Sequence, residues 1–280
     1  MGSSSPCTAC SWTSERQENC RYESHVKLFY EAGNRGVWSL GSNMILKDRG
    51  PGAPTREVEN ARFVEENTSI PVPTVVQSWN EDATGRTFIL LKRVPGEPLS
   101  AAWPKLSADQ KDNIARQTAQ YLQQLRSLQS NCLQALNGGP IYSNFLFPNR
   151  TSDVPHGPLA SDEDLWLDME RSLQHIPEAS RVRLRSRMPP ATPYTFTHND
   201  LINVNIMVDN GRLTGIIDWE WSGYFPVWCG EDREWKALLR KHMPDYSAAR
   251  EFWRDYWYLC IDPSSEKALK FLKEAESEDM

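Results

Sequence analysis

Residues 196–209, FTHNDLINVNIMVD, place a polar cluster between two short apolar runs. The apolar runs have the length of buried strands, and the cluster between them holds His198, Asp200 and Asn205. An ionisable group at the passage from one buried strand to the next is costly unless it is paired or used. The local fold is therefore predicted to be strand, polar loop, strand, with the loop as the candidate site.

The continuation of this stretch, GRLTGIIDWE, predicts a turn at Asn210-Gly211 and a strand that runs back. Such a hairpin brings Asp218 close to Asn205, and Asp200 adds a further carboxylate. A few hard oxygen ligands suit Mg²⁺, which keeps waters and takes substrate phosphates as partners. A carboxylate beside such a metal can orient and deprotonate a hydroxyl. The sequence predicts a magnesium and phosphate site at this hairpin.

Composition limits the class of function. The chain has 280 residues, 39% hydrophobic and 24% charged, which is typical of a soluble globular protein with one or two domains. The formal charge of −6 gives no support for nucleic-acid binding, which needs a clustered basic face. It mildly favours neutral or cationic small ligands over anionic ones.

Targeting signals and a disulfide framework are not expected. The sequence has no apolar run of about 18 residues, so no membrane span is predicted, and the N-terminus lacks a signal-peptide layout. We therefore expect a cytoplasmic location. Cys7-x-x-Cys10 could be half of a zinc site, but no second pair follows, and free thiols on a polar tail are favoured.

The first third of the chain predicts a small α+β lobe. Residues 1–20 are Ser-rich and polar and are expected to be a disordered tail, so the lobe covers residues 21–94. The expected elements are a helix at 21–32, two strands within 36–48, a helix at 54–67, and strands within 69–79 and 86–94.

Residues 95–280 predict a larger, mainly helical lobe. Pro95, Gly96 and Pro98 mark a linker, and Ser107-x-x-Gln110 is a capping box that opens a long helix. The apolar face of that helix is predicted to be core and consists of Ile114, Thr118, Tyr121, Leu125 and Leu128. A long loop is expected at 137–160, with further helices near 161–187, 228–240, 247–259 and 264–277.

The motif His198-x-Asp200-x-x-x-x-Asn205, followed by Ile217-Asp218, resembles the catalytic and metal-binding loops of the aminoglycoside phosphotransferase and choline kinase branch of the kinase-like fold. The similarity covers roughly residues 25–260. The segments ILK, EVENARFVEENTSIPVP, RVPGEPLSAAWPKLS and IIDWEWSGYFP look most like fungal members. The resemblance implies a two-lobed α+β fold with a β-rich, nucleotide-binding N-lobe and a larger helical C-lobe that carries the catalytic loop, the metal site and the acceptor site.

The resemblance also implies roles for the residues of the motif. Asp200 would be the catalytic base that accepts the proton of the substrate hydroxyl, and His198 would brace the catalytic loop. Asn205 and Asp218 would hold Mg²⁺ against the phosphates of ATP. Phosphoryl transfer needs chiefly alignment and charge neutralisation, and these groups would supply both.

Further roles fall on the N-lobe. By the resemblance, Lys47 would reach the α- and β-phosphates and Glu57 would pair with it. From the sequence alone Glu59 competes with Glu57 for that role, and both could be plain surface carboxylates. Glu220 could assist the site or be an ordinary exposed acid.

The remaining matches to the family pattern are weaker. Gly33 and Gly36 stand where the family carries its phosphate-covering loop, but the run is short. Lys92 and Val94 lie in the hinge run, where backbone groups normally hold adenine. Asn199 replaces a frequent glycine at a turn that favours positive φ, and Asn is the best-tolerated substitute there.

The acceptor is left open by the sequence. Trp219, Trp221, Tyr224, Phe225 and Trp228 could hold a sugar or an amine, or could be core. Glu231, Asp232 and Glu234 could attract amines, or could begin a solvated helix.

Two classes of function follow. The first is an ATP-dependent transfer of phosphate to a small-molecule hydroxyl, with Mg²⁺ as cofactor. The second is a catalytically weak or inactive relative that binds a nucleotide or metabolite. A protein kinase is less favoured, because the sequence has no Asp-Phe-Gly and no Ala-Pro-Glu.

Overall fold

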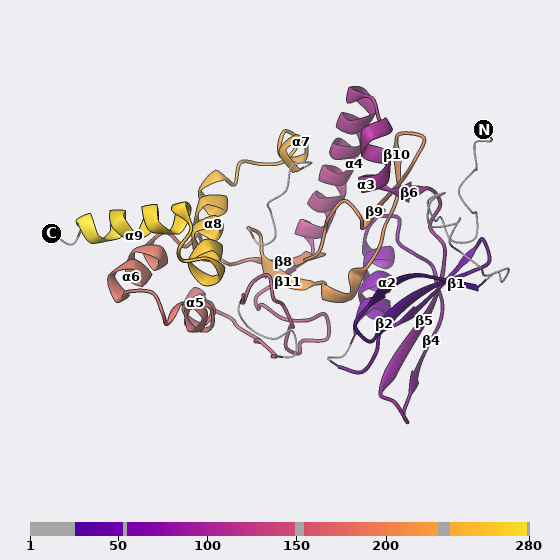
Figure 1. Cartoon of the computed structure of the whole chain (residues 1–280), viewed down its shortest axis with the longest axis horizontal. Helices are drawn as coiled ribbons and strands as arrows, with labels where there is room; N and C mark the ends of the chain where they lie inside the picture. The colour runs from indigo at the N-terminus through magenta and orange to yellow at the C-terminus, as the bar shows by residue number, and fades with distance from the viewer. Residues whose placement is uncertain (1–25, 53–54, 149–153, 229–235, 279–280) are drawn as a thin grey trace. The chain divides into compact units, whose positions relative to one another are not determined.

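The computed structural model describes residues 26–52, 55–148, 154–228 and 236–278 (Figure 1). The chain divides into two units, Met1–Gln110 with Asn203–Glu220, and Lys111–Ile202 with Trp221–Met280. A β-rich N-terminal part and a helical C-terminal part confirm the expected α+β, kinase-like fold. The expected lobe boundaries stay predictions, and the expected tail lies outside the described residues.

The first unit contains a five-stranded antiparallel sheet in the order β1-β2-β3-β5-β4 (Figure 1). Its strands are β1 (Val26–Ala32), β2 (Arg35–Leu40), β3 (Met44–Asp48), β4 (Val75–Glu81) and β5 (Arg86–Lys92). The strands at 36–48, 69–79 and 86–94 are thereby confirmed.

The helix expected at 21–32 was wrong where the structure describes it, because Val26–Ala32 is strand β1. Val26 and Leu28 are two residues apart, as residues on one face of a strand are, and they lie opposite Leu40 and Trp38 of β2. Pairing of this short segment with β2 outweighed its weak helical pattern.

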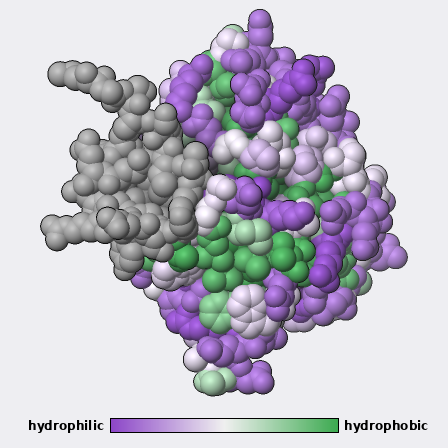
Figure 2. All heavy atoms as spheres, turned by 90° about the vertical axis from the view of Figure 1, so that its right-hand side faces the viewer, coloured by the Kyte–Doolittle hydropathy of each residue, from purple (hydrophilic) through white to green (hydrophobic). Residues whose placement is uncertain are grey.

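The two faces of the sheet differ in burial. Lys47 of β3 lies opposite Ile89 of β5, and both are buried. On the other face Leu46, Phe88 and Leu90 remain half-exposed, so apolar side chains reach the surface between polar ones (Figure 2). The buried face is the one that presents Lys47.

Helix α2 (Glu57–Asn67) confirms the helix expected at 54–67. Its buried positions include the polar residues Glu57 and Asn60 beside Ala61 and Val64. Buried polar side chains need partners, so this face of the helix is a place to look for a site.

The hairpin predicted at Asn210-Gly211 is also confirmed. β9 (Ile206–Asp209) pairs with β10 (Arg212–Ile216), and both turn residues have positive φ, as a tight hairpin requires. A third strand, β6 (Glu97–Pro98), pairs with β9. A Cβ at Gly96 would lie 2.2 Å from the carbonyl oxygen of Val208, so only glycine permits this approach.

The predicted capping box opens α4 (Ala108–Ser127), which runs from the first unit into the second. The Ser107 hydroxyl accepts a hydrogen bond from the Gln110 amide at 3.2 Å, and the Gln110 side chain accepts one from the Ser107 amide at 2.9 Å. Ile114, Thr118 and Leu125 are buried, which confirms the core face of this helix.

The second unit is mainly helical. Its sheet has the order β11-β8-β7, and the strands are β7 (Gln129–Ser130), β8 (Tyr194–Thr197) and β11 (Gly223–Pro226). The helices are α5 (Asp162–Glu170), α6 (Glu178–Ser186), α7 (Lys236–Arg240), α8 (Ser247–Ile261) and α9 (Glu266–Glu278). A core that includes Phe147, Tyr194, Phe225, Phe252 and Tyr256 joins them. In the described ranges, none of the helices has the length and apolar character needed to cross a membrane.

Candidate functional site

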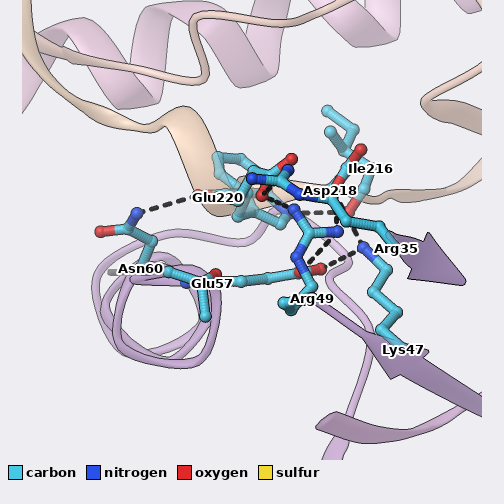
Figure 3. A network of polar contacts seen from close by, with 10 residues as sticks. Arg35, Lys47, Arg49, Glu57, Asn60, Ile216, Asp218 and Glu220 are labelled. Atoms are coloured by element: carbon cyan, nitrogen blue, oxygen red, sulfur yellow. Dashed lines mark hydrogen bonds and ion pairs between the residues drawn. The ribbon is translucent and has the colours of Figure 1, made fainter. Parts of the chain in front are cut away.

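A charged cluster lies in the first unit, where β3, α2 and the segment after β10 meet (Figure 3). The ammonium group of Lys47 contacts the Glu57 carboxylate and lies 2.9 Å from Oδ1 of Asp218. Lys47 and Glu57 are 6% and 3% exposed. The structure thus brings together three residues that the sequence placed in one site.

Lys47 remains charged despite its burial. Desolvation lowers its pKa, but the nearby carboxylates of Glu57 and Asp218 raise it by more, so the pKa lies above its ordinary value. A permanently protonated amine at this point can pair with phosphate oxygens.

The choice between the two acids of α2 is settled by burial. Glu57 contacts Lys47, whereas the Glu59 side chain is 62% exposed and lies 3.9 Å from Arg56. The pairing of Lys47 with Glu57 is therefore observed, while the role of this pair in catalysis stays a prediction.

Replacement of Glu57 by Gln is expected to destabilise the chain by about 2–4 kcal/mol, since it removes one partner of a buried ion pair. Glu59→Gln is the matched control and should change stability by less than about 0.5 kcal/mol, because Glu59 is exposed. Urea unfolding of both variants measures the difference. Equal effects would show that the Lys47–Glu57 contact contributes nothing specific.

Two arginines that sequence patterns did not identify extend the cluster, together with Glu220, whose side chain is 9% exposed and which the sequence had left as either an assistant of the site or an ordinary exposed acid. Nη1 of Arg49 lies 4.0 Å from Glu57 and 3.9 Å from Asp218, and Nη2 contacts Glu220. Nη1 of Arg35 lies 3.4 Å from Glu220. The available signal was the spacing of Arg49 from Lys47, since residues two apart on an extended chain share a face.

The two expected metal ligands lie at the same end of the hairpin. Asn205 precedes β9 and Asp218 follows β10, and the Ile217 amide donates to the Asn205 carbonyl at 2.9 Å. Asn205 is buried, and Asp218 is 27% exposed.

The donor set at the end of the hairpin is compatible with Mg²⁺. One carboxylate and one amide oxygen suit an ion that keeps waters and binds substrate phosphates. No group of three or more His, Cys, Asp or Glu side chains suited to a metal occurs among the described residues.

The segment after Asp218 is held rigidly against α2. The Asn60 side chain donates to the Trp219 carbonyl at 2.8 Å, and the Trp219 indole donates to the Ile216 carbonyl at 2.8 Å. Trp219 is fully buried. These contacts fix the backbone from which Asp218 and Glu220 project. No sequence pattern had identified Asn60.

The residues of the expected catalytic loop, His198, Asn199 and Asp200, lie in the second unit. His198 is 1% exposed, accepts a hydrogen bond from the Asp200 amide at 3.3 Å, and accepts another at its carbonyl from Ser222. Asn199 adopts a φ of 63° and donates to the Ser143 hydroxyl at 3.0 Å. The expected positive φ at Asn199 is confirmed, and its side chain links the loop at 137–160 to the catalytic loop.

The expected phosphate-covering segment is a tight turn. Gly33 and Asn34 alone join β1 to β2, and Gly33 has a φ of 60°. Gly36 is a buried residue of β2. The structure therefore offers a short hairpin here.

The hinge run has an amide, that of Val94, for which no hydrogen bond to a described residue is found. The amides of Lys92 and Arg93 donate to backbone carbonyls at 2.9 and 2.7 Å. The Val94 amide makes no hydrogen bond with any described residue. Of the two hinge positions named from the sequence, Val94 is the one whose amide stays open to an acceptor.

The aromatic residues that follow Asp218 in the sequence divide by burial. Phe225 and Trp228 are buried in the core of the second unit, as Trp219 is in the first, whereas Trp221 and Tyr224 are half-buried. The acids at 231, 232 and 234 and the cysteines Cys7 and Cys10 lie outside the described residues.

Comparisons with known proteins indicate the family and the fold of the chain. A family model described as a phosphotransferase enzyme family matches residues 31–229. A complex of APH(2")-IIa with streptomycin and ATP is similar at 17% identity and a TM-score of 0.54, with 94% of each chain covered. A GDP complex of aminoglycoside 2'-phosphotransferase-IIIa is similar at 15% identity and a TM-score of 0.55, covering 95% of this chain and 96% of that one.

A third solved structure is a thermostable mutant of aminoglycoside phosphotransferase APH(4)-Ia with ADP and hygromycin B. It shares 13% identity at a TM-score of 0.52, and the similarity covers 90% of this chain and 92% of that one. Likeness at this level of identity shows the fold. A comparison with curated proteins finds no match.

Proposed function

Because the chain belongs to the phosphotransferase enzyme family, we propose that it transfers the γ-phosphate of ATP to a hydroxyl group of a small molecule. The observation that carries the proposal is the cluster of Lys47, Glu57 and Asp218, in which a buried ammonium lies 2.9 Å from the expected metal ligand. Such an arrangement serves phosphoryl transfer by aligning and neutralising phosphates.

In this proposal Asp200 accepts the proton of the acceptor hydroxyl, and His198 positions the loop that carries it. The internal hydrogen bond between the Asp200 amide and His198 supports this division. The acceptor is a small molecule that carries a hydroxyl, such as a sugar or an amino alcohol, as the streptomycin and hygromycin B bound to the similar proteins suggest.

Asn205 and Asp218 would hold Mg²⁺, which supplies charge neutralisation at the phosphates when it is bound. Lys47 would pair with the phosphates, and the Val94 amide would hold the base. Gly33 and Gly36 would let the β1–β2 hairpin approach the phosphates. The nucleotides in the similar structures support a nucleotide at this site.

Two further points remain part of the proposal. The segments around Glu57 and Asp218 are similar to those of fungal members of the family, so the proposal includes a relationship to these members. It also includes a cytoplasmic location. Both rest on the sequence.

A nucleotide-binding module without turnover is the second candidate. It is favoured by the β1–β2 connection, which is a tight turn where the family carries a covering loop. A less complete cover over the phosphates would reduce transfer more than binding.

The test is ATP consumption by the full chain with Mg²⁺ over a panel of sugars, amino alcohols and other alcohols. Thermal stabilisation by ATP with and without Mg²⁺ is measured in parallel. Acceptor-dependent release of ADP supports the enzyme. Stabilisation without turnover of any acceptor, including those in a labelled metabolite extract, supports the module.

A further inference from the structure

The carboxylate of Glu220 is shared by two arginines of the first unit (Figure 3). Arg35 is the first residue of β2, directly after the glycine turn, and its Nη1 lies 3.4 Å from Glu220. Arg49 directly follows β3, and its Nη2 contacts the same oxygen. The two guanidinium groups therefore converge on one anionic group.

We propose that Arg35 and Arg49 form a phosphate-binding subsite beside Lys47, and that Glu220 fills this subsite in the ligand-free chain as a stand-in for a phosphate group. The inference deepens the proposed function, because the phosphate would be that of the bound nucleotide. A phosphate that enters must displace the Glu220 carboxylate from at least Arg35.

The chemistry of the arginine side chain supports this assignment. A planar guanidinium presents the same fork of N–H donors to a carboxylate and to a phosphate. A phosphate carries more charge and more acceptor oxygens than a carboxylate, so it satisfies two arginines better than Glu220 does. The Glu220 carboxylate can therefore occupy the subsite although a phosphate would bind the two arginines more strongly.

The burial of Arg49 supplies a second observation. Its side chain is 9% exposed, and its Nε makes no hydrogen bond with any described residue. Buried polar atoms are satisfied in nearly all proteins, so this N–H donor, left over at this point, indicates that an acceptor such as a phosphate oxygen completes the cluster.

The charge of the cluster points in the same direction. Lys47, Arg49 and Arg35 contribute three positive charges, and Glu57, Asp218 and Glu220 contribute three negative ones. A neutral cluster attracts a polyphosphate poorly, whereas the same cluster with Glu220 displaced is cationic. Glu220 therefore limits phosphate binding when no metal is present.

Accessibility indicates which arginine meets the ligand first. The Arg35 side chain is 32% exposed, against 9% for Arg49. Arg35 also follows the β1–β2 turn directly, so its contact with phosphate would hold that turn over the ligand. Arg49 remains beneath and keeps its contacts with Glu57 and Asp218.

The experiment measures binding of inorganic tripolyphosphate and of ADP to the full chain in EDTA, by calorimetry. Removal of the competing carboxylate in Glu220→Gln should tighten both about tenfold, and Arg35→Gln should weaken both about tenfold, each being one charge-assisted contact. The double variant should lose the gain. Glu59→Gln is the control, since it removes an exposed carboxylate from another arginine pair.

Several results would overturn the inference. Unchanged or weaker binding by Glu220→Gln would show that Glu220 does not compete with phosphate, and an equal gain in Glu59→Gln would reduce the effect to net charge. If Glu220→Gln fails to fold, Arg35→Gln and Arg35→Lys still decide: Lys should restore part of the affinity, and unchanged binding in Arg35→Gln refutes the subsite. Absence of turnover with every acceptor, while this pattern holds, would refute only the proposed function.

Discussion

Replacement of Asp200 by Asn is expected to lower the rate of phosphoryl transfer by about 10²–10⁴-fold, the usual range for loss of a general base. Affinity for ATP with Mg²⁺ should not change, because the role proposed for Asp200 concerns the acceptor hydroxyl, and Asn keeps the shape of the side chain. Steady-state ADP release and calorimetry with ATP measure the two quantities.

Asp209→Asn is the control for Asp200, because it removes an exposed carboxylate at the end of β9 and should leave turnover as it was. A variant at Asp200 that loses turnover and ATP binding to the same extent would place this residue among the nucleotide ligands and contradict its role as base.

Replacement of Asp218 by Asn is expected to weaken Mg²⁺-dependent binding of ATP by at least about 100-fold. Loss of a residue that only supports a metal ligand already lowers metal affinity by up to about 100-fold, and loss of the ligand itself should cost at least as much. Asn is the appropriate change because the residue has a φ of 70°, which Asn tolerates better than Ala does. Titration of ATP with Mg²⁺ and in EDTA separates the metal effect from the direct effect.

In EDTA the wild-type chain and the Asp218→Asn variant should bind ATP much more alike than they do with Mg²⁺. Thermal unfolding checks that the variant is folded, since Lys47 keeps its contact with Glu57. A loss of ATP affinity of the same size in EDTA would mean that Asp218 acts through Lys47 or Arg49 and not through a metal.

Sequence patterns predicted the parts of the fold that local spacing determines. The hairpin at Asn210-Gly211 follows from its turn residues, and the capping box at Ser107 and Gln110 follows from the spacing of two side chains. The position of Asn205 near Asp218 was predicted for the same reason, because antiparallel pairing fixes which residues lie at one end of a hairpin.

Other features depend on contacts between distant segments and could not be predicted in this way. Strand β1 owes its form to pairing with β2, which a short segment does not reveal by itself. The convergence of Arg35, Arg49 and Glu220 joins β2, the end of β3 and the segment after β10, and the spacing of Arg49 from Lys47 indicates only that these two residues share a face. The role of Asn60 likewise depends on its hydrogen bond to the Trp219 carbonyl, which lies in a distant segment of the sequence.

The pairing of β6 with β9 has a consequence for how such a chain can diverge. The pairing joins the segment after the five-stranded sheet to the hairpin that carries Asn205 and Asp218, so these residues belong to one compact unit. The expected base, Asp200, belongs to the other unit, and only Leu201 and Ile202 connect it to Asn203. Under the proposed function, mutation in the helical unit would change which alcohol is modified, while the proposed phosphate-binding residues of the first unit stay the same.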